Sequence, residues 1–71
     1  MYTTHITFTD GSTHTEDPIQ FDRIESTIRR LLFGPAAKFG IIKSFIIVDE
    51  MDCTIFEAVD GKITHPRKTG E

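Results

Sequence analysis

Two histidines and a glutamate are the residues closest to metal chemistry in this sequence. His5, His14 and Glu16 lie near the N-terminus, in two short segments rich in threonine. If a two-residue turn at Asp10-Gly11 joins these segments as a hairpin, the three side chains share its outer face. Imidazole and carboxylate groups bind zinc and related ions. The sequence offers no fourth ligand and no further residues that would orient these three by hydrogen bonds. We therefore expect a solvated β-surface and no metal site.

The other reactive residues lack the spacing of a catalytic or cofactor site. Cys53 is the only cysteine, and no basic residue stands next to it, so we expect a buried and unreactive thiol within a strand. The glycines are isolated, which excludes a glycine-rich phosphate loop. Ser26 lies in no nucleophile elbow, and His65 ends an expected strand. We therefore expect no enzyme activity and no cofactor.

Three arginines are the candidates for contact with nucleic acid. Arg23, Arg29 and Arg30 lie on the outer side of an expected helix, where a dimeric nucleic-acid-associated regulator would present them to phosphates. The formal net charge is −3, from eleven acidic and eight basic residues. Because this balance lacks the basic excess typical of nucleic-acid-binding domains, we keep that function as an alternative and expect no direct nucleic-acid binding.

Apolar periodicity predicts the elements that position these residues. Residues 2–9 and 12–16 alternate as two strands of a hairpin. Residues 18–33 form an expected helix that starts at Asp17-Pro18, or alternatively at a capping box from Asp22, and ends at Gly34-Pro35. Its apolar stripe contains Phe21, Ile24, Ile28, Leu31 and Leu32.

The second half of the chain predicts a three-stranded meander. A loop over 35–40 leads to strands at 41–49, 53–59 and 62–65, with a second Asp-Gly turn before the last strand. The order β-β-α-β-β-β predicts an α+β fold in two layers, an antiparallel sheet with one helix across it. Seventy-one residues suffice for one domain, which we place at 1–66, followed by a flexible polar tail at 67–71.

The meander presents a burial problem, because in register it is apolar on both faces. One face would carry Ile42, Ile46, Val48, Cys53, Ile55 and Val59, and the other Ile41, Phe45, Ile47, Phe56, Ala58 and Ile63. A single helix covers one face, and monomers rarely leave a large apolar patch bare. Three outcomes remain open: a curled sheet that covers itself, a second copy, or another protein.

We therefore expect a small protein-interaction module that acts as an inhibitor, adaptor or subunit, and that forms a homodimer. The expected contacts are the uncovered sheet face, the 33–39 loop and an acidic turn, namely Phe33, Phe39, Phe45, Ile47, Phe56, Asp49, Glu50 and Asp52. The acidic residues of that turn are either solvated or face a basic partner. A short chain without catalytic or cofactor motifs is typical of accessory proteins of bacteriophages and mobile elements.

The sequence also bears on the compartment. Its first residues lack the basic and apolar regions of a signal peptide, and no apolar run reaches the length of a membrane span. One cysteine permits no internal disulfide, although small secreted domains usually depend on such bonds. We therefore expect a cytoplasmic protein without membrane attachment.

Overall fold

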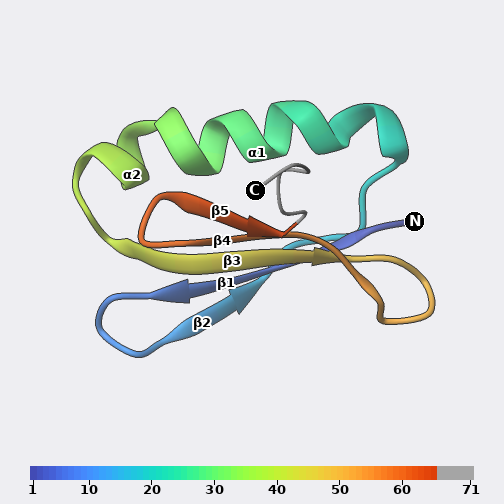
Figure 1. Ribbon diagram of the computed structural model, residues 1–71, viewed down its shortest axis with the longest axis horizontal. Coiled ribbons are helices and arrows are strands. Elements are labelled where there is room, and N and C mark those ends of the chain that lie inside the picture. Colours follow the sequence, from blue (N-terminus) through green and yellow to red (C-terminus); the bar gives the residue numbers. More distant parts are fainter. Residues whose placement is uncertain (66–71) are drawn as a thin grey trace, which may run out of the picture.

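The computed structural model describes residues 1–65 and shows an antiparallel sheet with helices on one side (Figure 1). The elements in chain order are β1 (Thr3–Phe8), β2 (Thr13–Thr15), the 3₁₀ turn η1 (Phe21–Arg23), α1 (Ile24–Phe33), α2 (Pro35–Lys38), β3 (Ile42–Val48), β4 (Thr54–Val59) and β5 (Lys62–His65). The strands lie in the order β2-β1-β3-β4-β5. This arrangement confirms the predicted α+β fold with its N-terminal hairpin and C-terminal meander. The predicted tail at 67–71 lies outside the described residues.

The first hairpin has a three-residue loop in place of the predicted two-residue turn. The Phe8 N–H donates to the Ser12 carbonyl at 2.8 Å, and the Gly11 N–H donates back to Phe8 at 3.0 Å. Gly11 alone in this loop has a positive φ, of 91°, which is typical of a three-residue hairpin loop with glycine in the left-handed region. The pairing of β2 with β1 is therefore shifted by one residue from the predicted register.

The helix begins later than predicted, and neither proposed start is used. Residues 17 and 18 lie in no helix, and Ile19 forms an antiparallel bridge in which Tyr2 and Ile19 exchange backbone hydrogen bonds of 2.8 Å in both directions. Helical structure starts with η1 at Phe21, and Gln20 and Arg23 at the two N-caps make no side-chain cap hydrogen bond. The pairing with Tyr2 thus overrides the local preference of Asp17-Pro18 for a helix start.

The core lies between α1 and the sheet. It contains Ile6, Leu31, Phe45, Ile47, Phe56 and Ala58, and Ile24, Ile28 and Leu32 pack against it. The rings of Phe45 and Phe56 stack with centroids 5.6 Å apart. Three residues predicted to contact a partner, Phe45, Ile47 and Phe56, are therefore buried beneath the helix instead of lying on an uncovered sheet face. Phe21 was predicted for the apolar stripe, yet it is exposed and contacts only Tyr2 among aromatic rings of residues 1–65.

The open face of the sheet is less apolar than the sequence predicted. In the register of β1, β3 and β4, Ile46 stands between His5 and Glu57, and Val48 stands opposite Thr3. The apolar residues of β3 on this face thus have polar neighbours from adjacent strands. They are half-buried or buried within the single chain, so this face exposes less apolar surface than the strand pattern alone indicated.

Candidate functional site

The largest exposed apolar side chains in one segment surround α2. Phe33 is 71% exposed, Phe39 81% and Ile41 46%. We call these three residues the apolar corner. Phe33 ends α1, and Phe39 directly follows the four residues of α2, so both lie at the same end of the molecule (Figure 1). Large exposed aromatic residues that gather in one place are typical of interaction sites.

Gly34 and Pro35 make the sharp junction between the two helices. The Gly34 N–H donates to the Arg30 carbonyl at 2.9 Å, which completes α1. Gly34 has extended backbone (φ −79°, ψ −176°), and Pro35 takes the first position of α2, where its missing N–H costs nothing. The helix end predicted at Gly34-Pro35 is confirmed, but a short helix replaces the predicted loop.

A Schellman motif ends α2 and fixes the direction of the chain into β3. The Gly40 N–H donates to the Ala37 carbonyl at 3.0 Å, and the Ile41 N–H donates to the Ala36 carbonyl at 3.2 Å. Gly40 has a φ of +70°, the left-handed conformation that this cap requires. The Ile41 carbonyl then accepts from the Thr9 N–H at 2.9 Å. The backbone of the apolar corner is thus held by hydrogen bonds on both sides of Phe39.

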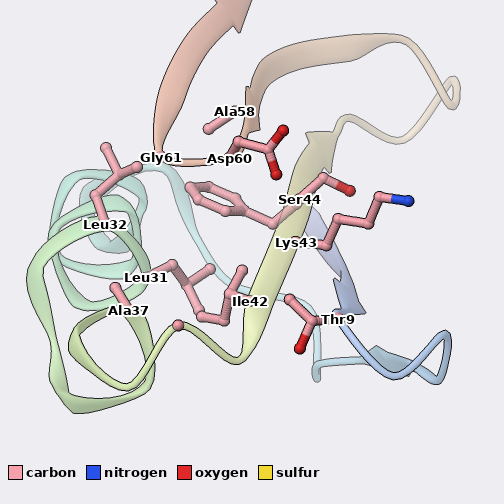
Figure 2. A pocket seen from close by; sticks show the side chains of 12 residues that line it. Thr9, Leu31, Leu32, Ala37, Ile42, Lys43, Ser44, Ala58, Asp60 and Gly61 are labelled. Atoms are coloured by element: carbon pink, nitrogen blue, oxygen red, sulfur yellow. The ribbon is translucent and has the colours of Figure 1, made fainter.

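A cavity of about 310 Å³ opens beside the apolar corner, between the helices and the ends of β3 and β4 (Figure 2). We call this hollow the corner cavity. Its apolar lining consists of Leu31, Leu32, Ala37, Ile42, Phe45 and Ala58. Polar residues and glycines line the rest, namely Thr9, Gly40, Lys43, Ser44, Asp60 and Gly61. The side chain of Lys43 extends away from the helices, so its ammonium group leaves the floor of the corner cavity apolar.

Each exposed phenylalanine is a sequence neighbour of a residue that lines this cavity. Leu32, which lines it, precedes Phe33, and Gly40, which also lines it, follows Phe39. The sequence pointed to Phe33 and Phe39 as contacts, but it missed Ile41 and the corner cavity. The glycines on both sides of 35–39 were the available signal, because each ends a helix here. The cavity itself is formed by residues from four separate elements.

Two of the three helix arginines have carboxylate partners. Arg29 lies 2.8 Å from Glu25, and Arg30 lies 2.6 Å from Glu16. Arg30 and Arg23 line a more open hollow of about 690 Å³ between the 16–20 segment and α1, together with acidic residues. Because the carboxylates compensate these charges, the surface lacks the continuous positive potential that phosphate binding needs.

The three residues considered as metal ligands do not share a face. His14 stands opposite Ile6 in the β1–β2 pairing, whereas His5 stands opposite Thr15, so the two imidazoles point to opposite sides of the sheet. His5 Nδ1 lies 2.9 Å from the Thr15 hydroxyl, and Glu16 is paired with Arg30. Among residues 1–65, no group of three potential ligands comes together.

The acidic turn between β3 and β4 is ordered by hydrogen bonds from its backbone to the Asp49 carboxylate. Asp49 accepts hydrogen bonds from the Met51 and Cys53 N–H groups at 2.8 and 3.0 Å, and Asp52 has a φ of 61°. Glu50 lies 2.6 Å from the N-terminal ammonium group. Cys53 is exposed, so the prediction of a buried thiol is wrong: the turn extends through residue 53, and β4 starts only at Thr54.

Neither helix in the described part of the chain has the length and hydropathy needed to cross a membrane. Comparison with known proteins finds no matching family model, no matching curated protein and no matching solved structure.

Proposed function

We propose that this chain is a non-enzymatic protein-interaction module, an inhibitor, adaptor or subunit that binds another protein through the apolar corner and the corner cavity. The observation that carries the proposal is Phe39, a phenylalanine 81% exposed on an ordered backbone beside a hollow with an apolar floor. Burying such a side chain contributes about 1.5–3 kcal/mol, which makes it a suitable anchor for a partner.

Rigidity of the corner adds to its suitability for binding. The hydrogen bonds at Gly40 and Ile41 hold the backbone around Phe39 before any partner arrives. A surface that is ordered in advance loses less conformational entropy on association, and this raises affinity without further contacts. The exposed apolar side chains of the corner and its ordered backbone therefore favour the same function.

Site-specific photo-crosslinking tests this proposal. A photoreactive phenylalanine analogue is placed at residue 39 or, as a matched control, at Met51, which is equally exposed at 81% but lies in the acidic turn. We expect residue 39 to crosslink to a discrete protein in cells of the native host, and residue 51 to give no such product. Equal products at both positions, or none at residue 39, would overturn the proposal.

The response to salt distinguishes a protein partner from a nucleic acid. Apolar contacts at Phe39 retain their strength or gain some at high salt, whereas phosphate contacts weaken steeply. We therefore expect the crosslinked product to persist when the lysate is brought to high ionic strength before irradiation. Loss of the product with salt, together with recovery of nucleic acid, would support the regulator alternative through Arg23, Arg29 and Arg30.

A further inference from the structure

We infer that the corner cavity also takes a second copy of this chain, with Phe39 of each copy inserted into the corner cavity of the other around a two-fold axis. This inference rests on the same surface as the proposed function, and the dimer and the partner protein would compete for it. A two-fold contact uses the same patch on both copies, so projection and recess must lie side by side. Here Phe39 and the cavity-lining Gly40 are consecutive residues.

The size and lining of the cavity suit an aromatic ring. An apolar protein cavity of roughly 150 Å³ accommodates benzene, and the corner cavity measures about 310 Å³. Its floor contains Leu31, Phe45 and Ala58, each no more than 4% exposed. A phenyl ring entering it would contact aliphatic side chains and the buried Phe45 ring, an environment in which aromatic pairs are favourable.

The distribution of charge also favours a copy as the occupant. Identical surfaces bring like charges together near a two-fold axis, so such an interface requires few charges at its centre, or charges of both signs. Residues 31–42 contain one charged residue, Lys38, and the corner cavity is lined by one residue of each sign, Lys43 and Asp60, so Lys38 of one copy meets a cavity that holds a carboxylate of the other. The acidic turn at residues 49–52 lies at the far end of β3 from the corner (Figure 1), so its three carboxylates remain distant from the contact.

Sedimentation velocity of the purified chain, from the micromolar to the millimolar range, is the first measurement. We expect the wild type to shift from monomer to dimer and F39E to remain monomeric throughout. The control M51E, at an equally exposed site away from the corner, should dimerise as the wild type does. Circular dichroism and a cooperative thermal transition establish that each variant is folded. A wild type that is monomeric over this range overturns the inference.

A mixing experiment tests whether Phe39 enters the cavity. A37W fills the cavity from its own wall and should be monomeric; if A37W does not fold, A37L replaces it. An F39E copy retains an intact cavity, and an A37W copy retains an intact Phe39, so their mixture restores one of the two contacts. Because the chain has no tryptophan, tryptophan absorbance follows the A37W copy. We expect a mixed dimer weaker than the wild-type dimer.

The outcomes separate this inference from the proposed function. If A37W dimerises at the same concentration as the wild type, or if the mixture does not associate, Phe39 does not use the cavity and the inference is overturned. A monomeric wild type whose residue 39 still crosslinks to another protein overturns the dimer and leaves the proposed function standing. A wild type that dimerises through Phe39 while residue 39 crosslinks only to a second copy supports the inference and overturns the proposed function.

Discussion

The backbone carbonyl of Arg30 occupies the space in which a Cβ atom at Gly34 would have to lie. The same carbonyl accepts the Gly34 N–H at 2.9 Å, so the two residues are held together at the end of α1. Because the obstacle is backbone, it cannot rotate aside as a side chain would. This close approach explains why glycine is needed at a position whose φ of −79° any residue could adopt.

We expect G34A to lower the free energy of unfolding by about 1–3 kcal/mol, as other overpacked substitutions do. Urea denaturation followed by circular dichroism measures this change. G40A is the matched comparison, because a Cβ at Gly40 meets no atom within 4 Å although φ is +70°. Its cost should be about 1–2 kcal/mol and purely conformational. An unchanged midpoint for G34A would contradict the close approach of Arg30.

The hydroxyl of Thr4 predicts a stabilising substitution. Thr4 is 1% exposed, and its Oγ1 atom has no hydrogen-bond partner among the described residues. A buried polar group without a partner reduces stability, and valine has a similar shape without the hydroxyl. We expect T4V to raise the free energy of unfolding by about 1 kcal/mol. T7V, on the open face, should change it by less than about 0.5 kcal/mol, and a loss of stability in T4V would show that the hydroxyl is satisfied.

The loop of the first hairpin predicts a measurable pKa. The Ser12 hydroxyl donates to Asp10 at 2.6 Å and the Ser12 N–H at 2.8 Å, and these bonds lower the pKa of Asp10 below its usual 3.8. We expect S12A to raise the pKa of Asp10 toward 3.8, because the hydroxyl is the largest cause. NMR titration of the Asp10 carboxyl carbon measures this, with S26A as the control. An unchanged pKa in S12A would contradict the contact.

The sign of the linked stability follows from the direction of that shift. Because the pKa of Asp10 is lower in the folded chain, its ionised form stabilises the hairpin at pH values above 3.8. This contribution is lost as the pH falls through the folded pKa of Asp10. We therefore expect D10N to reduce stability at neutral pH and to make no difference in strong acid, as measured by urea denaturation at both pH values.

The exposure of Cys53 predicts ready modification of the native protein. The thiol lies in the turn before β4 and is exposed, and it donates a long hydrogen bond of 3.9 Å to the Met51 carbonyl. Access to solvent is the main requirement for reaction with a disulfide reagent once the thiolate forms. We expect the folded chain to react at a rate within a few fold of the urea-unfolded chain, monitored by absorbance. Strong protection in the folded state would indicate a buried sulfur.

Local patterns in the sequence determined the type of each main element and several of its ends. The strand predicted at 62–65 coincides with β5, and β3 lies within the predicted 41–49. Alternation and β-branched residues act on the backbone locally, so these features need no distant contact. The end of α1 at Phe33 has the same origin, because Gly34-Pro35 ends a helix wherever it lies.

Tertiary structure alone decided the loop at Asp10-Gly11 and the site. The same Asp-Gly pair makes a two-residue turn at Asp60-Gly61, with both φ values positive, and part of a three-residue loop at Asp10-Gly11. In the second case the register places Glu16 on the side of α1, where it meets Arg30. The choice of buried face, the exposure of Phe39 and the corner cavity likewise depend on how separate elements pack. Such contacts join residues far apart in the chain, and no local pattern encodes their geometry.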